Sequence, residues 1–375
     1  MVWYLYDPFT LIAFILAYII GFTVLMVIAS RVAPSVARRL AGKFTLHESM
    51  VIAGLMVVVS GLAGVGLVAY ALMGALGAEI TASVITSILA LVLVLNAVSY
   101  VTAPLLINIM YGAKPSAQLQ EAVNHVAEKL GLSKPPKAVV VRGPPNAFAY
   151  GNFLFGKYVA VSSSLLDITT PEMLEAIIGH ELGHHKHRDN AIMLFMGLIP
   201  SALYFLGIML IRASIVAGYA RAYSSSSRRG NGGLALLLAG VAAVVISFVV
   251  QVVVLAFSRL REYYADSTGA YASSPKAMQR ALAALHLYYS RRPAALEAVS
   301  SSKLKALFIY AFTEAYANPY YRYGQPRGIR DVDIDRVVEE LKRQRTEGIS
   351  EFLSTHPPIP KRIRFLDTLE FKEAR

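Results

Sequence analysis

Five long apolar stretches constrain the fold of this chain more than any other feature of its sequence. Each is about as long as the roughly 20 residues that an α-helix needs to cross the hydrocarbon core of a bilayer. The composition agrees, because 55% of the residues are hydrophobic and 16% are charged, whereas soluble domains carry about 25% charged residues. The sequence therefore predicts a mainly α-helical integral membrane protein with about four to five transmembrane helices. The stretches cover residues 10–28, 50–76, 85–107, 191–216 and 234–257.

The apolar stretches differ in what they indicate. Residues 10–28 lack the basic flank and the small-residue cleavage site of a signal peptide, so we expect this stretch to remain as a span. Pro200 interrupts the stretch at 191–216. This stretch and the one at 234–257 either cross the membrane or form a helical hairpin that packs against a neighbouring domain. The predicted organisation is three spans within residues 1–111 and a transmembrane or membrane-associated hairpin over residues 191–257.

Basic residues in the loops indicate the orientation. Residues 1–8 contain no Lys or Arg, the loop after the first span contains Arg31, Arg38, Arg39 and Lys43, and residues 77–81 again contain none. Because loops rich in Lys and Arg stay in the cytoplasm, this pattern places the N-terminus outside and the chain after residue 107 inside. The three arginines of residues 219–233 disagree with this scheme. We keep the cytoplasmic orientation because the segments on both sides of the hairpin are also basic.

The net charge of +12 does not by itself indicate a nucleic-acid partner. The sequence shows no basic-aromatic binding module, and basic residues that flank membrane spans account for the excess. We therefore expect the lipid bilayer, and no nucleic acid, among the partners. The chain has no cysteine, which excludes disulfides, cysteine nucleophiles and cysteine metal ligands.

Residues 170–187 predict a helix that carries a metal-binding motif. Thr170 is a suitable N-cap, Pro171 fits the first helical position, and apolar residues follow at helical spacing. His180 and His184 stand four residues apart and share one face, so both imidazoles can bind one metal ion. The alternative is a polar helix with solvated histidines. The apolar surroundings weaken it, because buried imidazoles need partners.

Three further residues of this helix have different expected roles. Glu181 follows the first histidine and can act as a general base for a water molecule on the metal. His185 and His187 lie off the ligand face. We expect both to be ordinary solvated residues near the helix end, where a positive charge is favoured.

A third metal ligand is expected from residues 258–269. Catalytic zinc sites with two histidines commonly take a glutamate as the third protein ligand. Glu262 and Asp266 lie on one helical face, so Glu262 can bind the metal while Asp266 accepts the free N–H of a ligating histidine. The alternative is a surface helix, because Arg259 and Arg261 lie in the same segment.

A small sheet is predicted just before the metal-binding helix. Residues 137–142 and 157–162 are rich in β-branched residues and indicate strands, and residues 117–131 indicate an amphipathic helix. An exposed edge of this sheet can pair with an extended peptide through main-chain hydrogen bonds. The alternative is a plain hairpin without such a role.

The C-terminal part of the chain is expected to be helical with one rigid turn. Residues 272–290 and 303–316 indicate helices, and residues 331–345 indicate a charged helix with a solvated face. His356 precedes two prolines that stiffen the backbone, so a rigidly held imidazole with an arginine nearby can stabilise an oxyanion. The alternative is a proline-terminated linker.

The motifs NAFAYG, HELGH, EYYAD and STHPP followed by KRI, in this order, resemble those of the M48 family of membrane zinc metalloproteases, most closely its HtpX-like members. The resemblance implies a helical gluzincin-type domain built from two halves. The first, residues 112–190, contains the small sheet and the HELGH helix, and the second, residues 258–375, contributes the third ligand. HtpX-like proteins have two hydrophobic segments before this domain, whereas this chain shows three.

The resemblance also implies a role for each matching residue. One Zn2+ per chain is bound by His180, His184 and Glu262, Glu181 serves as base and acid, and Asp266 supports a ligand. His356 and Arg362, near the C-terminus, stabilise the oxyanion. In some relatives the histidine that matches His356 instead masks the metal as a fourth ligand. The edge strand holds the substrate backbone through Asn146, Ala147, Phe148 and Ala149.

The expected function is therefore peptide-bond hydrolysis by a zinc-dependent endopeptidase of the cell membrane, with its catalytic domain in the cytoplasm. The resemblance implies polypeptide substrates, among them misfolded membrane proteins, and a role in quality control under stress. A processing protease of the Ste24 type and a non-proteolytic zinc-binding chaperone or assembly factor remain as alternatives. A transporter is disfavoured because the spans hold almost no charged residues.

Overall fold

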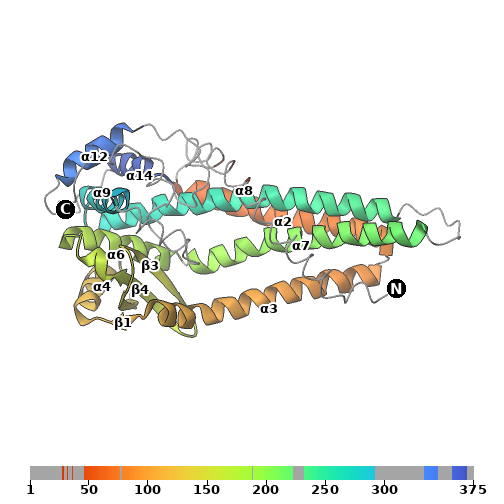
Figure 1. The fold of residues 1–375 in the computed structure, drawn as a ribbon, viewed down its shortest axis with the longest axis horizontal. Coiled ribbons are helices and arrows are strands. Elements are labelled where there is room, and N and C mark those ends of the chain that lie inside the picture. The colour runs from red at the N-terminus through yellow and green to blue at the C-terminus, as the bar shows by residue number, and fades with distance from the viewer. Residues whose placement is uncertain are drawn as a thin grey trace. The chain divides into compact units, whose positions relative to one another are not determined.

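The chain divides into two compact units (Figure 1). The helical unit comprises residues 1–98 and 193–257, and the mixed unit comprises residues 99–192 and 258–375. The predicted span at 10–28, apart from its last residue, and the predicted helix at 303–316 lie outside the described residues. The computed structural model describes residues 46–76, 78–187, 189–222, 232–291, 333–344 and 357–369, with three isolated positions before them.

Four long helices carry the other four apolar stretches. They are α2 (Leu46–Leu76), α3 (Ala78–Tyr111), α7 (Asp189–Ala222) and α8 (Gly232–Ala272). The prediction of a mainly helical membrane protein is confirmed. Within the described part of the chain, the segments long and apolar enough to cross a membrane are Glu48–Gly66, Met196–Gly218 and Gly233–Ala272.

Glycines let α7 and α8 approach closely inside the helical unit. A Cβ atom added at Gly207 would lie 2.8 Å from the carbonyl oxygen of Gly240, and the reverse substitution would meet the Gly207 oxygen at 2.8 Å. Small residues are typical of such crossings in membranes, where close van der Waals packing holds helices together. Pro200 does not end α7, and Ser247 of α8 donates a hydrogen bond to its carbonyl oxygen at 2.8 Å.

The mixed unit contains a four-stranded sheet in the order β1-β2-β4-β3. β2 and β4 run parallel, whereas β3 and β4 form an antiparallel hairpin in which Ala149 is opposite Val159. The predicted strands are therefore present, and the NAFAYG motif lies along one edge of the sheet. The strands are β1 (Lys114–Pro115), β2 (Lys137–Val141), β3 (Ala147–Asn152) and β4 (Gly156–Ser162).

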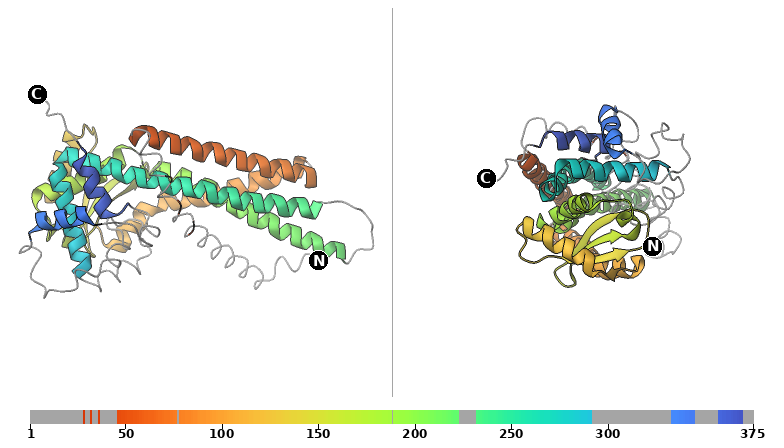
Figure 2. Two further views of the ribbon diagram at one scale, coloured as in Figure 1. Left: turned by 90° about the horizontal axis from the view of Figure 1, so that it is seen from above. Right: turned by 90° about the vertical axis from the view of Figure 1, so that its left-hand side faces the viewer.

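Helices pack on both faces of this sheet. On one face, Val159 and Val161 join the main core together with α4 and α6, and Figure 2 shows α4 beside the sheet. On the other face, Tyr150 packs with Ile107 near the end of α3. The helices of the mixed unit are α4 (Ala117–Lys129), α5 (Ser163–Leu166), α6 (Pro171–Lys186), α9 (Pro275–Arg291), α12 (Ile334–Arg343) and α14 (Ile359–Asp367), together with the ends of α3, α7 and α8.

One prediction about these helices is wrong in part. The helix predicted at 331–345 is present as α12, but it is not simply solvated, because Val337, Val338 and Leu341 are buried in the main core. These three apolar residues recur at helical spacing among many charged ones. A high density of charge therefore concealed an amphipathic helix.

Candidate metal centre

The HELGH motif lies in the second half of α6, at a buried position. Thr170 caps the helix by accepting a hydrogen bond from the Met173 N–H at 3.4 Å, and Pro171 follows as the first helical residue. Ile177, Ile178 and Leu182 anchor the helix in the main core. This packing buries His180 and Glu181, which are 1% and 2% exposed.

Two glycines of α6 allow the last turns of α8 to come close. A Cβ atom at Gly179 would lie 2.5 Å from the Ala272 Cβ, and one at Gly183 would lie 3.1 Å from the Thr268 Cβ. From the other side, a Cβ atom at Gly269 would lie 2.5 Å from the Ala176 carbonyl oxygen. The close contact brings the EYYAD segment of α8 against the histidines.

The structure brings together the three residues predicted as metal ligands. The Nε2 atoms of His180 and His184 lie 3.2 Å apart, and they lie 3.7 and 3.9 Å from the two carboxylate oxygens of Glu262. A tetrahedral ion with bonds of about 2.0–2.1 Å places its donor atoms about 3.3 Å apart. The donor set therefore fits one metal ion.

A carboxylate lies behind each histidine. His180 Nδ1 lies 2.9 Å from Asp266 Oδ1, and His184 Nδ1 lies 2.7 Å from Asp189 Oδ2. A carboxylate at this distance favours the tautomer with hydrogen on Nδ1 and leaves a lone pair on Nε2. Two such lone pairs 3.2 Å apart repel each other unless a cation lies between them. This arrangement also fits a bound metal ion.

Asp189, at the start of α7, was missed by the sequence analysis. Its side chain is buried, and the Nε atom of Arg261 lies 2.8 Å from its Oδ2. Burial acts to raise the pKa of Asp189, but the hydrogen bond with His184 and the positive charge of Arg261 hold this pKa below its usual value. The signal in the sequence is an acidic residue one turn beyond the second histidine, matched by an arginine next to Glu262.

Arg362 binds the other supporting carboxylate. Its Nε and Nη2 atoms lie 2.7 and 2.5 Å from the two oxygens of Asp266, and both side chains are fully buried. The guanidinium thus lies behind Asp266, which in turn contacts His180. His356, the other residue predicted to stabilise the oxyanion, lies outside the described residues.

The side chain of Glu181, within the HELGH motif, faces the edge strand β3. Its carboxylate accepts a hydrogen bond from the backbone N–H of Ala149 in β3. Burial raises the pKa of Glu181 to about 7, above that of an ordinary glutamate. The outer edge of β3 therefore faces Glu181.

The four candidate substrate-binding residues have different environments. Asn146 precedes β3, where its N–H donates to the Ser162 hydroxyl oxygen at 2.9 Å and its carbonyl oxygen accepts from the Ser162 N–H at 2.8 Å. Phe148 is buried in the core between the sheet and α3. Because backbone groups alternate along a strand, the Ala149 N–H that meets Glu181 implies that Ala147 also directs its N–H away from β4. The outward N–H groups of Ala147 and Ala149 therefore lie on the edge of β3 that no described strand covers.

The prediction of solvated histidines at the end of α6 is wrong for His185. This residue is 6% exposed, and its Nε2 lies 2.8 Å from the carbonyl oxygen of Tyr158. Burial lowers the pKa of His185 to about 4. His187 is half-buried, and its ring lies edge-on to that of Tyr264 at 4.3 Å between centroids. His185 and His187 lie off the face of α6 that carries the ligands, but β4 covers His185 and Tyr264 of α8 packs against His187.

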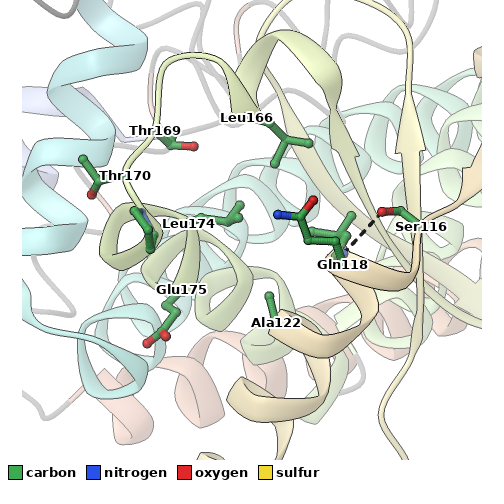
Figure 3. Close-up of a pocket in the computed structure, with 10 residues that line it drawn as sticks. Ser116, Gln118, Ala122, Leu166, Thr169, Thr170, Leu174 and Glu175 are labelled. Carbon is green, nitrogen blue, oxygen red and sulfur yellow. Dashed lines mark hydrogen bonds between the residues drawn. The ribbon is translucent and has the colours of Figure 1, made fainter.

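A separate pocket lies at the opposite end of α6 (Figure 3). It has a volume of about 340 Å³, with Gln118 and Ala122 of α4 on one side and Leu174 and Glu175 of α6 on the other. His180 and His184 lie about one and a half and two and a half turns beyond Glu175 along α6. The pocket is therefore not part of the candidate metal centre.

The fold and the donor set match what a membrane metalloprotease requires. A family model, described as peptidase family M48, matches residues 113–370, and the chain belongs to that family. Two relatives named "Protease HtpX homolog" extend this similarity to almost the whole chain. The relative from Archaeoglobus fulgidus is 45% identical over 98% of this chain and 99% of its own length, and the one from Pyrobaculum calidifontis is 47% identical over 94% and 96%.

The resemblance inferred from the motifs is thus confirmed. Because these relatives align over nearly their full length, the region before residue 113 is shared with them as well. A solved structure titled "Crystal Structure of S. mikatae Ste24p" aligns with a TM-score of 0.47 and 17% identity, over 76% of this chain and 58% of that chain.

Proposed function

We propose that this protein is a zinc-dependent endopeptidase that hydrolyses peptide bonds on the cytoplasmic side of the cell membrane. The observation that carries the proposal is the convergence of His180, His184 and Glu262 on one point, with Glu181 beside it. Two imidazole nitrogens and one carboxylate oxygen form a donor set typical of catalytic zinc. One ion per chain would polarise the scissile carbonyl group and make water a stronger acid.

Glu181 performs the proton transfers in this proposal. Its carboxylate takes a proton from the attacking water and returns it to the leaving amine nitrogen. The Ala149 N–H holds one carboxylate oxygen in place, which orients the group before reaction. Asp266 and Asp189 hold the two imidazoles in the tautomer and orientation that a metal ion requires.

The substrate binds as an extended strand along the outer edge of β3. The backbone groups of Ala147 and the carbonyl oxygen of Ala149 pair with the peptide, while Asn146 and Phe148 hold the strand in place through β4 and the core. This arrangement places the peptide backbone next to Glu181. It favours unfolded segments over folded ones, because a strand added at an edge must be extended.

Charge on the oxyanion is stabilised by His356, supported by the rigid turn that its two prolines impose. Arg362 acts differently from the expectation of a direct contact. Its guanidinium is bound by Asp266, so it serves the reaction by holding the carboxylate that supports His180.

The cytoplasmic orientation rests on the basic first loop and the neutral second loop. The proposed substrates are misfolded or unassembled membrane proteins, because the metal centre and the membrane helices belong to one chain. A Ste24-type processing protease and a zinc-binding chaperone are the alternatives. A chaperone would bind zinc and unfolded protein without cleaving it.

Purified full-length protein tests the proposal through a pair of matched variants. Glu181→Gln should retain about one zinc ion per chain but cleave casein and a misfolded membrane substrate about 10²–10⁴-fold more slowly. Glu175→Gln, on the same helix and paired at the surface with Lys129, should behave like the parent. Full activity in Glu181→Gln contradicts the mechanism. A parent protein that binds zinc and cleaves neither substrate supports the chaperone instead.

A further inference from the structure

The turn between β3 and β4 exposes three consecutive large apolar side chains. Phe153, Leu154 and Phe155 are 79%, 60% and 43% exposed, although most residues of the strands on either side are buried. A contiguous exposed apolar group of this kind marks a surface that meets a partner or a membrane. We call these three residues the hairpin tip.

The hairpin tip has a defined backbone conformation. The Oδ1 atom of Asn152 accepts hydrogen bonds from the N–H groups of Leu154 and Phe155, at 3.0 and 2.9 Å. Gly156 has a φ of 88°, and a Cβ atom at Gly151 would overlap its carbonyl oxygen. The apolar side chains therefore project from a held turn, which cannot fold back to cover them.

The same asparagine ties the hairpin tip to α3. Pro104 lies inside α3 and has no N–H, so the carbonyl of Tyr100 lacks the donor that a helix normally supplies four residues later. The Nδ2 group of Asn152 donates to the Tyr100 oxygen at 2.8 Å and to the Val101 oxygen at 3.0 Å. Proline is tolerated in membrane helices where a neighbouring group satisfies the freed carbonyl. The amide of Asn152 meets this need.

This tie places the hairpin tip beside a predicted membrane span. Tyr100 lies seven residues before the end of the span at 85–107, which corresponds to about 10 Å along a helix. Tyr150 is hydrogen-bonded to Asn108, so β3 runs along α3 from the end of the span toward its interior. On the same part of α3, Leu105, Leu106, Ile109 and Met110 are all 48% exposed or more.

We propose that the hairpin tip inserts into the lipid bilayer next to α3, with Phe153, Leu154 and Phe155 in contact with acyl chains. The charge around the sheet favours this occupant. Between Glu128 and Asp167 the sequence contains no acidic residue and five basic ones; Lys129 is paired with Glu175, and the other four suit the phosphate headgroups of a bilayer. Insertion of the hairpin tip gives the mixed unit a second attachment to the membrane, in addition to the chain's membrane-spanning helices. It also fixes the depth at which the edge strand β3 is presented.

Single-cysteine labelling tests this proposal directly, because the chain has no cysteine of its own. Leu154→Cys is compared with Leu166→Cys, an exposed leucine beyond the other end of β4, roughly 20 Å away along the strand. Each full-length variant is labelled with an environment-sensitive fluorophore and reconstituted in vesicles of phosphatidylcholine and phosphatidylglycerol. Quenching is measured with nitroxide-labelled lipids and with aqueous iodide.

We expect nitroxide lipids to quench the label at position 154 several-fold more strongly than the label at 166, and iodide to show the reverse order. Adding Asn152→Ala to the Leu154→Cys variant should reduce the lipid quenching, because the tip loses its tie to α3. Equal iodide quenching at both positions overturns the proposal. So does a label at 154 that is open to iodide in vesicles and becomes protected only when unfolded casein is added, because the tip then binds polypeptide. No turnover is measured, so the result is independent of peptide cleavage.

Discussion

Replacing Asp189 by asparagine tests how the metal centre is built. The substitution keeps the shape of the side chain but removes the negative charge that lies 2.7 Å from His184 Nδ1 and 2.8 Å from Arg261 Nε. Loss of such a supporting carboxylate typically lowers metal affinity about 10–100-fold, which corresponds to about 1.4–2.7 kcal/mol. Arg261 also loses its carboxylate partner in a site where its side chain is 11% exposed. The free energy of unfolding should therefore fall by about 3 kcal/mol.

The measurement is a chelator competition that gives the Kd for zinc, performed in the Glu181→Gln background so that cleavage does not interfere. Asp167→Asn provides the matched control, because this aspartate is exposed in the same unit and should leave the Kd unchanged. His184→Ala marks the complete loss of a ligand. A Kd in Asp189→Asn that equals the control value would refute the reasoning, because it would show that Asp189 does not set the state of His184.

Three further changes have defined outcomes. Gly179→Ala places a Cβ atom 2.5 Å from the next helix and should cost about 1–3 kcal/mol of stability, whereas Gly197→Ala, with open space around it, should be neutral in the same thermal melt. Arg362→Met leaves the buried carboxylate of Asp266 without its guanidinium partner, so we expect a loss of about 3–5 kcal/mol in denaturant unfolding. Adding Asp266→Leu to Arg362→Met should restore part of this loss; equal losses would count against the pair. Burial lowers the pKa of His286 from 6.5 to about 4, so the unfolded state binds the proton first, and stability should be complete above pH 6.5 and decrease by about 3 kcal/mol as the pH falls to 4. Metal-free melts at several pH values should show this dependence weakened in His286→Gln.

The sequence predicts the parts of the metal centre that lie within one helical period. His180 and His184 share a face because they are four residues apart, and Glu262 and Asp266 do so for the same reason. The helical spacing of these residues does not predict that α6 and α8 contact each other. It depends on Gly179 and Gly183, whose missing side chains let α8 approach, and a glycine inside a helix gives no sign of which neighbour it will meet.

Residues whose roles depend on a third element were predicted less well. The helical period places His185 off the ligand face and therefore indicates a solvated position. In the structure β4 covers that side of α6, and the carbonyl oxygen of Tyr158 is hydrogen-bonded to the imidazole. Asp189 belongs to the next helix, and only the fold brings it to His184. Asn152 is the last residue of β3, in a segment that the sequence alone describes as a plain hairpin. Its partner is the Tyr100 carbonyl freed by Pro104, and Tyr100 lies 52 residues earlier in the sequence.

The pairing of charges around the centre explains why it suits a divalent cation. Asp266 is matched by Arg362, and Asp189 is matched by Arg261, so each carboxylate that supports a histidine is already neutralised by its own guanidinium. Glu262 contributes a negative charge directly at the donor atoms, and Glu181, when ionised, contributes a second. Two negative charges at a buried site are costly without compensation, and one doubly charged ion between them balances the count. The two arginines therefore neutralise Asp266 and Asp189, the carboxylates that hold the histidines. The remaining negative charge, on Glu262 and ionised Glu181, equals the charge of one divalent ion.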